Sequence, residues 1–157
     1  MGSLSKQIFF NAPLEKVWKI WTDVEKTPEW VEGVQSSKIT SPIKEGKGLE
    51  WEEKCVFGKQ TIQMDHAMKE WDVLKKTFAR TGLPMGGSME TTAEFRSVGA
   101  GSPRPGEGTS PLHTEVNLLV EWDLGMVGMM IGEDKLHHMM DKALSATTSK
   151  WKAKAES

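Results

Sequence analysis

The sequence predicts a single α+β domain over residues 1–157, in which a curved antiparallel sheet packs around a long C-terminal helix and encloses an apolar cavity. Three observations predict this fold. Helical spacing follows a short apolar run near the start, residues 35–122 alternate between polar and apolar with frequent turn residues, and helical spacing returns after Gly125. With 157 residues and 38% hydrophobic residues, the chain can fill one core but not two.

The opening of the chain predicts a strand followed by two short helices. The apolar residues of Leu4–Asn11 predict a short strand. Pro13 suits the first turn of a helix, whose apolar residues then recur at helical spacing. Asp23 can cap a second helical turn, and Pro28 interrupts it before Trp30 brings the chain back toward the core.

The middle of the chain predicts six further strands. Their short connections favour antiparallel neighbours, and a meander is the simplest topology. Two segments rich in Gly, Pro or Ser, Gly82–Gly87 and Gly99–Pro111, are predicted to be flexible links that gate a ligand's entry. The predicted strands are Ser36–Thr40, Leu49–Phe57, Gln60–Trp71, Lys75–Thr81, Ser88–Val98 and Thr114–Trp122.

The last segment predicts one long amphipathic helix with a broad apolar stripe. A stripe this wide needs a concave surface to cover it, and the preceding sheet is the candidate. The stripe comprises Met129, Leu136, Met139, Met140, Ala143, Leu144, Thr147 and Trp151.

The second and third predicted strands form a hairpin whose register can be read from the sequence. Gly58 and Lys59 lie between two alternating runs, as a two-residue turn would. If Phe57 pairs with Gln60, one face collects mostly apolar residues and the other collects charged and polar ones. The predicted inner pairs are Cys55 with Ile62, Glu53 with Met64, Trp51 with His66 and Leu49 with Met68.

This register places two ionisable residues, Glu53 and His66, diagonal to each other on the apolar face. Burying them is costly unless they are paired or hydrogen-bonded. They are therefore candidates for a polar anchor of a ligand or for a catalytic acid/base pair. The structural alternatives are a core histidine with a carboxylate partner, or a slipped strand that leaves both in water.

The candidate ligand-binding residues follow from the same face and from the apolar stripe. Methionines adapt to ligands of varied shape, although each one can equally be core filler. Arg80 is ambiguous, because the length of the turn near Asp72 decides which face it occupies; an inward Arg80 would pair with a ligand carboxylate or with Glu53. The predicted set is Trp30, Trp51, Met64, His66, Met68, Arg80, Met139 and Met140.

Composition argues against several classes of partner and cofactor. Twenty basic and 22 acidic side chains, a net charge of -2, provide no footprint for nucleic acid. Cys55 is the only cysteine, which excludes an internal disulfide and favours a reducing, cytoplasmic location. No apolar run reaches the roughly 20 residues that span a bilayer. The adjacent His137 and His138 would point about 100° apart on a helix, so we predict no metal site, and no phosphate-binding motif predicts an organic cofactor.

Several segments together resemble the polyketide cyclase/dehydrase branch of the START and plant-allergen (SRPBCC) superfamily. These are Ala12–Trp18, Trp21–Glu25, Pro28–Trp30, Val120–Gly125 and the closing amphipathic helix. The resemblance spans essentially the whole chain and implies a helix-grip fold: a seven-stranded antiparallel sheet, two short helices after the first strand, and a long last helix across the concave face. The chain contains no tyrosine, so it cannot reproduce the tyrosine-dependent chemistry of some members.

The resemblance leaves three functions open, because members bind lipids, sterols, hormones, polyketides or quinones and a minority are enzymes. The first is binding of a small hydrophobic molecule in the cavity. The second is a cofactor-independent cyclase or dehydratase in which His66 moves a proton and Glu53 holds its ring. The third is a protein-interaction module of the chaperone co-activator type, which predicts an exposed apolar patch.

Overall fold

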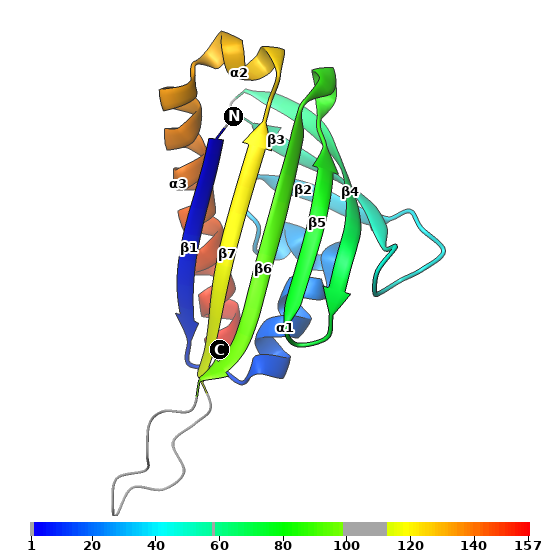
Figure 1. Cartoon of the computed structure of the whole chain (residues 1–157), viewed down its shortest axis with the longest axis vertical. Helices are drawn as coiled ribbons and strands as arrows, with labels where there is room; N and C mark the ends of the chain where they lie inside the picture. Colours follow the sequence, from blue (N-terminus) through cyan, green and yellow to red (C-terminus); the bar gives the residue numbers. More distant parts are fainter. Residues whose placement is uncertain (1, 58, 99–112) are drawn as a thin grey trace, which may run out of the picture.

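The computed structural model describes residues 2–57, 59–98 and 113–157, and Figure 1 shows the order of the elements along the chain. The strands are β1 (Gly2–Phe10), β2 (Val34–Ile39), β3 (Glu50–Phe57), β4 (Gln60–Asp72), β5 (Lys76–Gly82), β6 (Ser88–Val98) and β7 (His113–Asp123). The helices are α1 (Leu14–Thr22), the 3-10 helices η1 (Val24–Glu29) and η2 (Pro84–Gly86), α2 (Met126–Ile131) and α3 (Glu133–Glu156).

The seven strands form one antiparallel sheet in the order β1-β7-β6-β5-β4-β3-β2. Strands β2 to β7 follow one another as the predicted meander, which confirms that part of the topology. The strand β1 instead pairs with β7 at the far edge, a long-range pairing for which the sequence pattern contained no signal. The predicted link Gly99–Pro111 lies outside the described residues.

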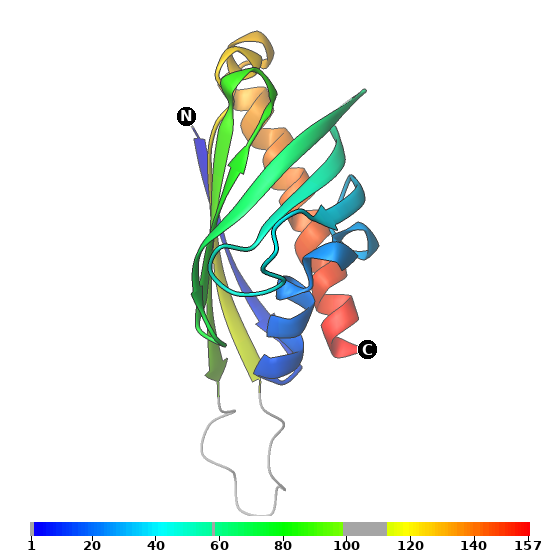
Figure 2. The ribbon, with the colours of Figure 1, turned by 90° about the vertical axis from the view of Figure 1, so that its right-hand side faces the viewer.

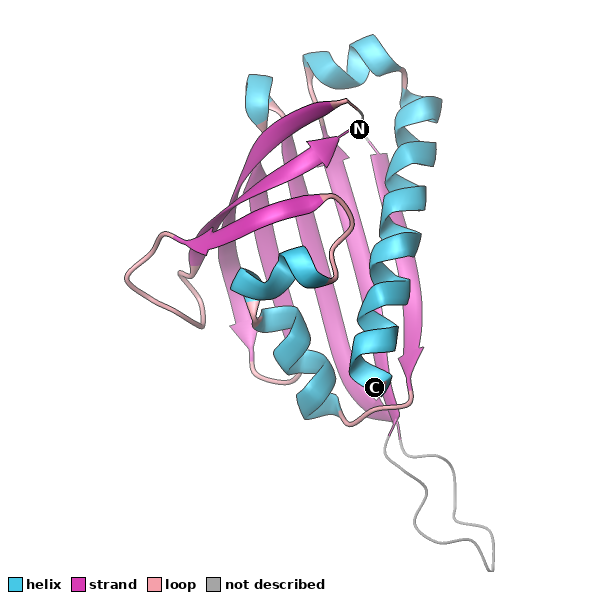
Figure 3. Cartoon of the chain, turned by 180° about the vertical axis from the view of Figure 1, so that it is seen from behind, coloured by secondary structure: helices cyan, strands magenta, loops and turns pink. Residues whose placement is uncertain are grey.

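The long helix α3 lies across the concave face of the sheet, which confirms the predicted helix-grip arrangement (Figures 2 and 3). One contact that holds it there comes from Lys6 on β1, whose Nζ is 2.9 Å from Asp141 Oδ1 and 3.2 Å from Ser145 Oγ. The hydrogen bond and charge of Lys6 lower the pKa of the Asp141 carboxyl. The helix is therefore fastened to the edge strand next to β7.

The predicted C-terminal helix is divided in two, which corrects the apolar stripe at its start. Gly132 has φ of 92°, a left-handed conformation that separates α2 from α3. Met129 consequently belongs to α2, where 86% of it is exposed, and it does not pack on the sheet. The stripe that contacts the sheet begins at Leu136, which is fully buried.

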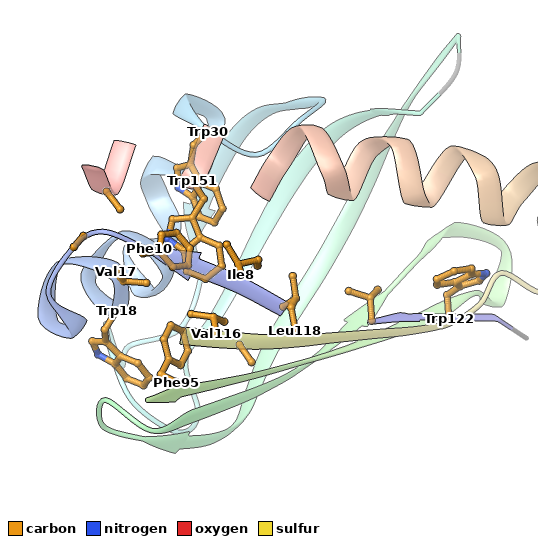
Figure 4. Close-up of a cluster of buried hydrophobic side chains, with 14 of the residues drawn as sticks. Ile8, Phe10, Val17, Trp18, Trp30, Phe95, Val116, Leu118, Trp122 and Trp151 are labelled. Carbon is orange, nitrogen blue, oxygen red and sulfur yellow. The ribbon is translucent and has the colours of Figure 1, made fainter. Parts of the chain in front are cut away.

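One end of the interior is filled by aromatic rings (Figure 4). Trp151 of α3 is fully buried at its centre, stacked on Trp21 at 4.9 Å and tilted against Phe10 at the same centroid distance. Trp30 packs against both Trp151 and Trp21, with ring centroids 5.4 Å and 6.0 Å away. Helix α1 completes this end with Trp18, which makes an edge contact with Phe95. These rings close the space between sheet and helix at the end where α1 lies.

Candidate functional site

Beyond the aromatic rings, the sheet and α3 enclose a cavity of about 350 Å³. Its size falls within the range of small-molecule sites, about 300–1,000 Å³. Its walls come from all seven strands, from α1 and α3, and from η1 and η2, and they are largely apolar. Six of the eight predicted ligand-binding residues line it, namely Trp30, Trp51, Met64, His66, Met68 and Met140.

The β3–β4 hairpin builds one wall in the predicted register. Trp51 lies opposite His66 and Glu53 opposite Met64, while the residues between them face outward. Glu53 is 5% exposed and His66 is 9% exposed, so both ionisable side chains are inside. The alternative in which a slipped strand leaves them in water is therefore wrong.

The two side chains are joined in a hydrogen-bonded network with two threonines. His66 Nε2 is 2.6 Å from Glu53 Oε1, and His66 Nδ1 is 2.6 Å from Thr81 Oγ1. Glu53 Oε2 accepts a hydrogen bond from the hydroxyl of Thr27. The chain of contacts therefore runs Thr27–Glu53–His66–Thr81, and all four residues are buried and line the cavity.

The two threonines were not among the predicted site residues. Thr27 belongs to η1 and lies 26 residues before Glu53, so no local pattern links them. Thr81 lies directly opposite His66 in the β4–β5 ladder. The sequence could predict the inward position of Thr81 only if it could also predict the register of the β4–β5 ladder.

The ring of Trp51 stacks on the imidazole of His66, with centroids 4.9 Å apart and planes 21° from parallel. Because both nitrogens of His66 are held and one face is covered, the ring has one orientation in the cavity wall. This arrangement can present a fixed polar group to a bound molecule, and it can hold a proton between a carboxylate and an imidazole.

Cys55, on the same wall as Glu53, carries an unreactive thiol. Burial raises the pKa of Cys55 to about 11, and the negative charge of Glu53 adds to the effect. The thiolate is the nucleophilic form of cysteine, so a thiol that stays protonated at neutral pH is a poor nucleophile. Cys55 therefore contributes to the cavity as a small apolar group.

Arg80 does not line the cavity, so the inward orientation on which its predicted role as a ligand-binding residue depended is not found. Its side chain is 57% exposed and lies 3.1 Å from Glu90 on the outer face. The cause is a β-bulge in β4, where the register shifts between Met68 and Glu70. Without the bulge Arg80 would lie opposite Met68 and face inward; with it, Arg80 lies opposite Ala67.

Met139 is the second predicted residue that does not line the cavity. It lies about 100° around α3 from Met140, which does line it. The residues of α3 that face the cavity with Met140 are Ala143, Leu144, Thr147, Thr148 and Trp151. The predicted stripe was therefore too wide by one position at this turn.

Within residues 2–57, 59–98 and 113–157, no group of three or more His, Cys, Asp or Glu side chains could hold a metal ion. His137 and His138 are both exposed, as expected for a solvated helix face. None of the helices in the described part of the chain is long and apolar enough to cross a membrane.

Comparison with known proteins gives both a family and a set of structural neighbours. A family model described as polyketide cyclase / dehydrase and lipid transport matches residues 10–139. No curated protein matches the chain.

Three solved structures share the fold at low sequence identity. A protein from Thermus thermophilus is 18% identical with a TM-score of 0.73, and the match covers 98% of this chain and 97% of that one. A START superfamily protein from Mycobacterium smegmatis is 17% identical with a TM-score of 0.68, covering 98% and 97%. The Zhui aromatase/cyclase from a Streptomyces species is 14% identical with a TM-score of 0.75, covering 99% and 93%.

Proposed function

The chain belongs to the polyketide cyclase / dehydrase and lipid transport family, and from this premise we propose that it binds one small, largely apolar molecule in the cavity between its sheet and α3. The observation that carries the proposal is a cavity of about 350 Å³ whose largely apolar walls contain the buried network of Thr27, Glu53, His66 and Thr81. An empty apolar space of this size is unfavourable in a packed core, since each lost contact costs stability. A ligand that fills the cavity removes that cost.

The affinity of such a ligand comes from the walls and its orientation from the network. Burial of about 300 Å² of apolar surface contributes about 7 kcal/mol, before the cost of association is subtracted. Met64, Met68 and Met140 allow the walls to adapt to ligand shape. Glu53 and His66 serve in this proposal as a polar anchor with one fixed geometry.

The entry route in this proposal passes the segment predicted to gate the cavity. Leu83, Pro84 and Met85, in and next to η2, line the cavity, and Met85 is 60% exposed. A residue that is both exposed and part of the lining belongs to the mouth of the cavity.

The single cysteine and the net charge of -2 support a cytoplasmic protein whose partner is a small molecule rather than nucleic acid.

Native mass spectrometry of protein purified from its own source tests the proposal. We expect a co-purifying small molecule, released on denaturation, that is absent from a variant in which Met64→Trp fills the cavity. Circular dichroism of the variant shows whether it has folded. Protein that is always recovered empty, and whose tryptophan fluorescence responds to no apolar molecule, contradicts the proposal.

A second candidate is an enzyme of the cyclase or dehydratase type, and the 2.6 Å contact between His66 Nε2 and Glu53 Oε1 favours it. In this mechanism His66 transfers a proton to or from an enolisable carbon while Glu53 fixes its ring. With the co-purified molecule as substrate, His66→Ala would abolish turnover and leave binding largely intact. Equal loss of turnover and binding assigns His66 to the anchor instead.

The third possibility, a protein-interaction module, has weaker support. It predicts a packed interior and an exposed apolar patch. Met126, Met129 and Met130 of α2 are exposed, but the interior beside Glu53 and His66 is hollow. The cavity favours a small molecule over a protein as the principal partner.

A further inference from the structure

The polar network has one member whose hydrogen-bonding partners are incomplete. Both oxygens of Glu53 and both nitrogens of His66 are occupied. The Thr27 hydroxyl lies between Glu53 Oε2 and the carbonyl of Val24, so its one hydrogen already has an acceptor. Among the described residues Thr81 Oγ1 contacts only His66 Nδ1, so it is the end of the network and the place where a ligand's polar atom can be added.

The number of protons held by Glu53 and His66 determines whether the Thr81 hydroxyl donates its hydrogen to His66 or into the cavity. If the carboxylate is ionised and the imidazole neutral, the ring proton lies on Nε2 facing Glu53, and Nδ1 accepts from the Thr81 hydroxyl. If the pair holds one more proton, on the His66 ring or on the Glu53 Oε1 that faces it, Nδ1 carries a hydrogen and donates to Thr81. The hydroxyl hydrogen of Thr81 is then free to donate into the cavity. A proton on Glu53 Oε2, which faces Thr27, would instead leave Nδ1 as an acceptor.

The surroundings favour the state with the additional proton. The lining contains no Lys or Arg among the described residues, and its other ionisable groups are the Cys55 thiol and Glu32, which pairs with Lys150. Without the proton the network carries an uncompensated negative charge in an apolar wall, which costs several kcal/mol. One unpaired hydroxyl hydrogen costs less, about 1–3 kcal/mol.

The stacking of Trp51 on His66 acts in the same direction. A protonated imidazole over the face of an indole gains about 0.5–2 kcal/mol from the cation–π interaction. The ring centroids are 4.9 Å apart and nearly parallel, within the range at which this attraction operates. Burial therefore favours a net-neutral network, and the stacking favours the additional proton on the His66 ring over Glu53 Oε2.

We infer that Thr81 is the residue that determines ligand specificity, and that it selects an apolar molecule bearing a carbonyl oxygen by donating a hydrogen bond to it. This inference rests on the proposed function. A carbonyl oxygen accepts the free hydrogen of Thr81 and brings no hydrogen of its own. An alcohol of the same shape also accepts it, but its hydroxyl hydrogen is left without a partner in the apolar wall.

Binding of three tricyclic probes of nearly equal size tests the inference: fluorene, 9-fluorenone and 9-fluorenol. Tryptophan fluorescence titration of the whole chain gives the three affinities. For the unchanged protein we expect fluorenone to bind about tenfold more tightly than fluorenol, since one unpaired hydrogen costs about 1–3 kcal/mol and 1.4 kcal/mol is a factor of ten. Thr81→Val, which keeps the shape and removes the hydroxyl, abolishes the preference, and Thr81→Ser retains it.

Arg80→Ala provides the matched control, because Arg80 is the neighbouring residue on the outer face and should leave the ratio unchanged. The infrared carbonyl band of bound fluorenone gives a readout that needs no variant, and a hydrogen bond lowers its frequency relative to an apolar solvent. Trp30 Nε1 and Trp151 Nε1 also line the cavity and are buried without a hydrogen-bond partner in the described structure, so Trp30→Phe and Trp151→Phe are measured as well. If Thr81→Val fails to fold, a band shift that survives both of these variants supports Thr81, and a shift that either one removes overturns the inference.

The outcomes separate the two proposals. If none of the three probes binds, the proposed function fails for molecules of this size, and the inference falls with it. If all three bind alike, with an unshifted carbonyl band, the cavity binds apolar molecules but Thr81 does not select them. Tighter binding of fluorenol overturns the inference, because it means that Thr81 donates to His66 and the network is anionic.

Discussion

The two ends of the interior are built on the same sheet and the same helix, yet one is filled and the other is hollow. At the α1 end, Trp18 and Trp21 project from α1 and meet Phe95 and Trp151. At the other end the short helices η1 and η2 add small or flexible side chains such as Thr27 and Met85, and α3 presents small ones such as Ala143. The aromatic residues Trp21, Trp30 and Trp151 form the floor of the cavity.

This difference indicates that one end contributes most to stability, while the other offers the space for the proposed ligand binding. The aromatic end carries close-packed contacts, each of which is lost if a ring is removed. The hollow end carries the buried polar network and has space to exchange apolar contacts with a ligand. The following measurements test whether the two ends differ in this way.

The largest expected effect is on global stability at the filled end. Trp151→Ala removes a fully buried ring from the centre of the cluster, and such changes cost about 3–5 kcal/mol. Met64→Ala, at the half-buried wall of an existing cavity, should cost less than about 2 kcal/mol. Urea unfolding followed by circular dichroism measures both, and equal losses would show that the two ends are energetically alike.

The next effect concerns the network at the hollow end. His66→Ala removes the partner of Glu53 and leaves a carboxylate buried without compensation, which costs about 3 kcal/mol. Replacing both residues by apolar ones, with His66→Leu and Glu53→Met together, should cost less than His66→Ala alone, since no charge is then stranded. The same unfolding experiment decides this point. A double variant less stable than the single one would show that the pair contributes net stability.

The smallest expected effect is on the rate at which the Cys55 thiol, in the cavity wall, is alkylated. Its pKa is raised to about 11, so at pH 8 the thiolate fraction is about 100-fold lower than for a thiol of pKa 9.0. Alkylation of the folded protein at pH 8 should be slower by this factor than alkylation in urea, and it should accelerate between pH 9 and 11.

The raised pKa of Cys55 also affects the free energy of unfolding. The sign of this effect depends on whether the folded or the unfolded chain keeps the thiol proton. Between pH 9 and 11 the unfolded chain loses the Cys55 proton while the folded one keeps it, so stability falls as pH rises through this window. Cys55→Ser removes this contribution and serves as the control. Reaction at the same rate in folded and unfolded protein contradicts the burial of this thiol.

The inward positions of Glu53 and His66 could be predicted from the sequence, because both residues belong to one local hairpin. A two-residue turn and alternating polarity sufficed to place Glu53 diagonal to His66, and the ladder confirms that register. The other half of the network could not be predicted. Thr27 reaches Glu53 from η1, and Thr81 meets His66 only because of a bulge that shifts the β4–β5 register by one residue.

Arg80 shows the consequence of this one-residue shift in the β4–β5 register. The period of a strand is two, so a shift of one exchanges the faces: Thr81 enters the cavity and Arg80 leaves it. Composition and alternation alone do not locate a bulge, because it is set by the twist and packing of neighbouring strands. Met139 illustrates the same limit on α3, where apolar residues extend past the face that lines the cavity.

Local periodicity and turn chemistry were sufficient to predict the order of the elements, the meander, the long C-terminal helix and the inner face of the β3–β4 hairpin. Only the tertiary structure decided that β1 closes against β7, that aromatic rings fill one end, and that about 350 Å³ stays open at the other. Empty volume is a difference between the space enclosed by distant elements and the side chains that enter it. No local pattern encodes that difference.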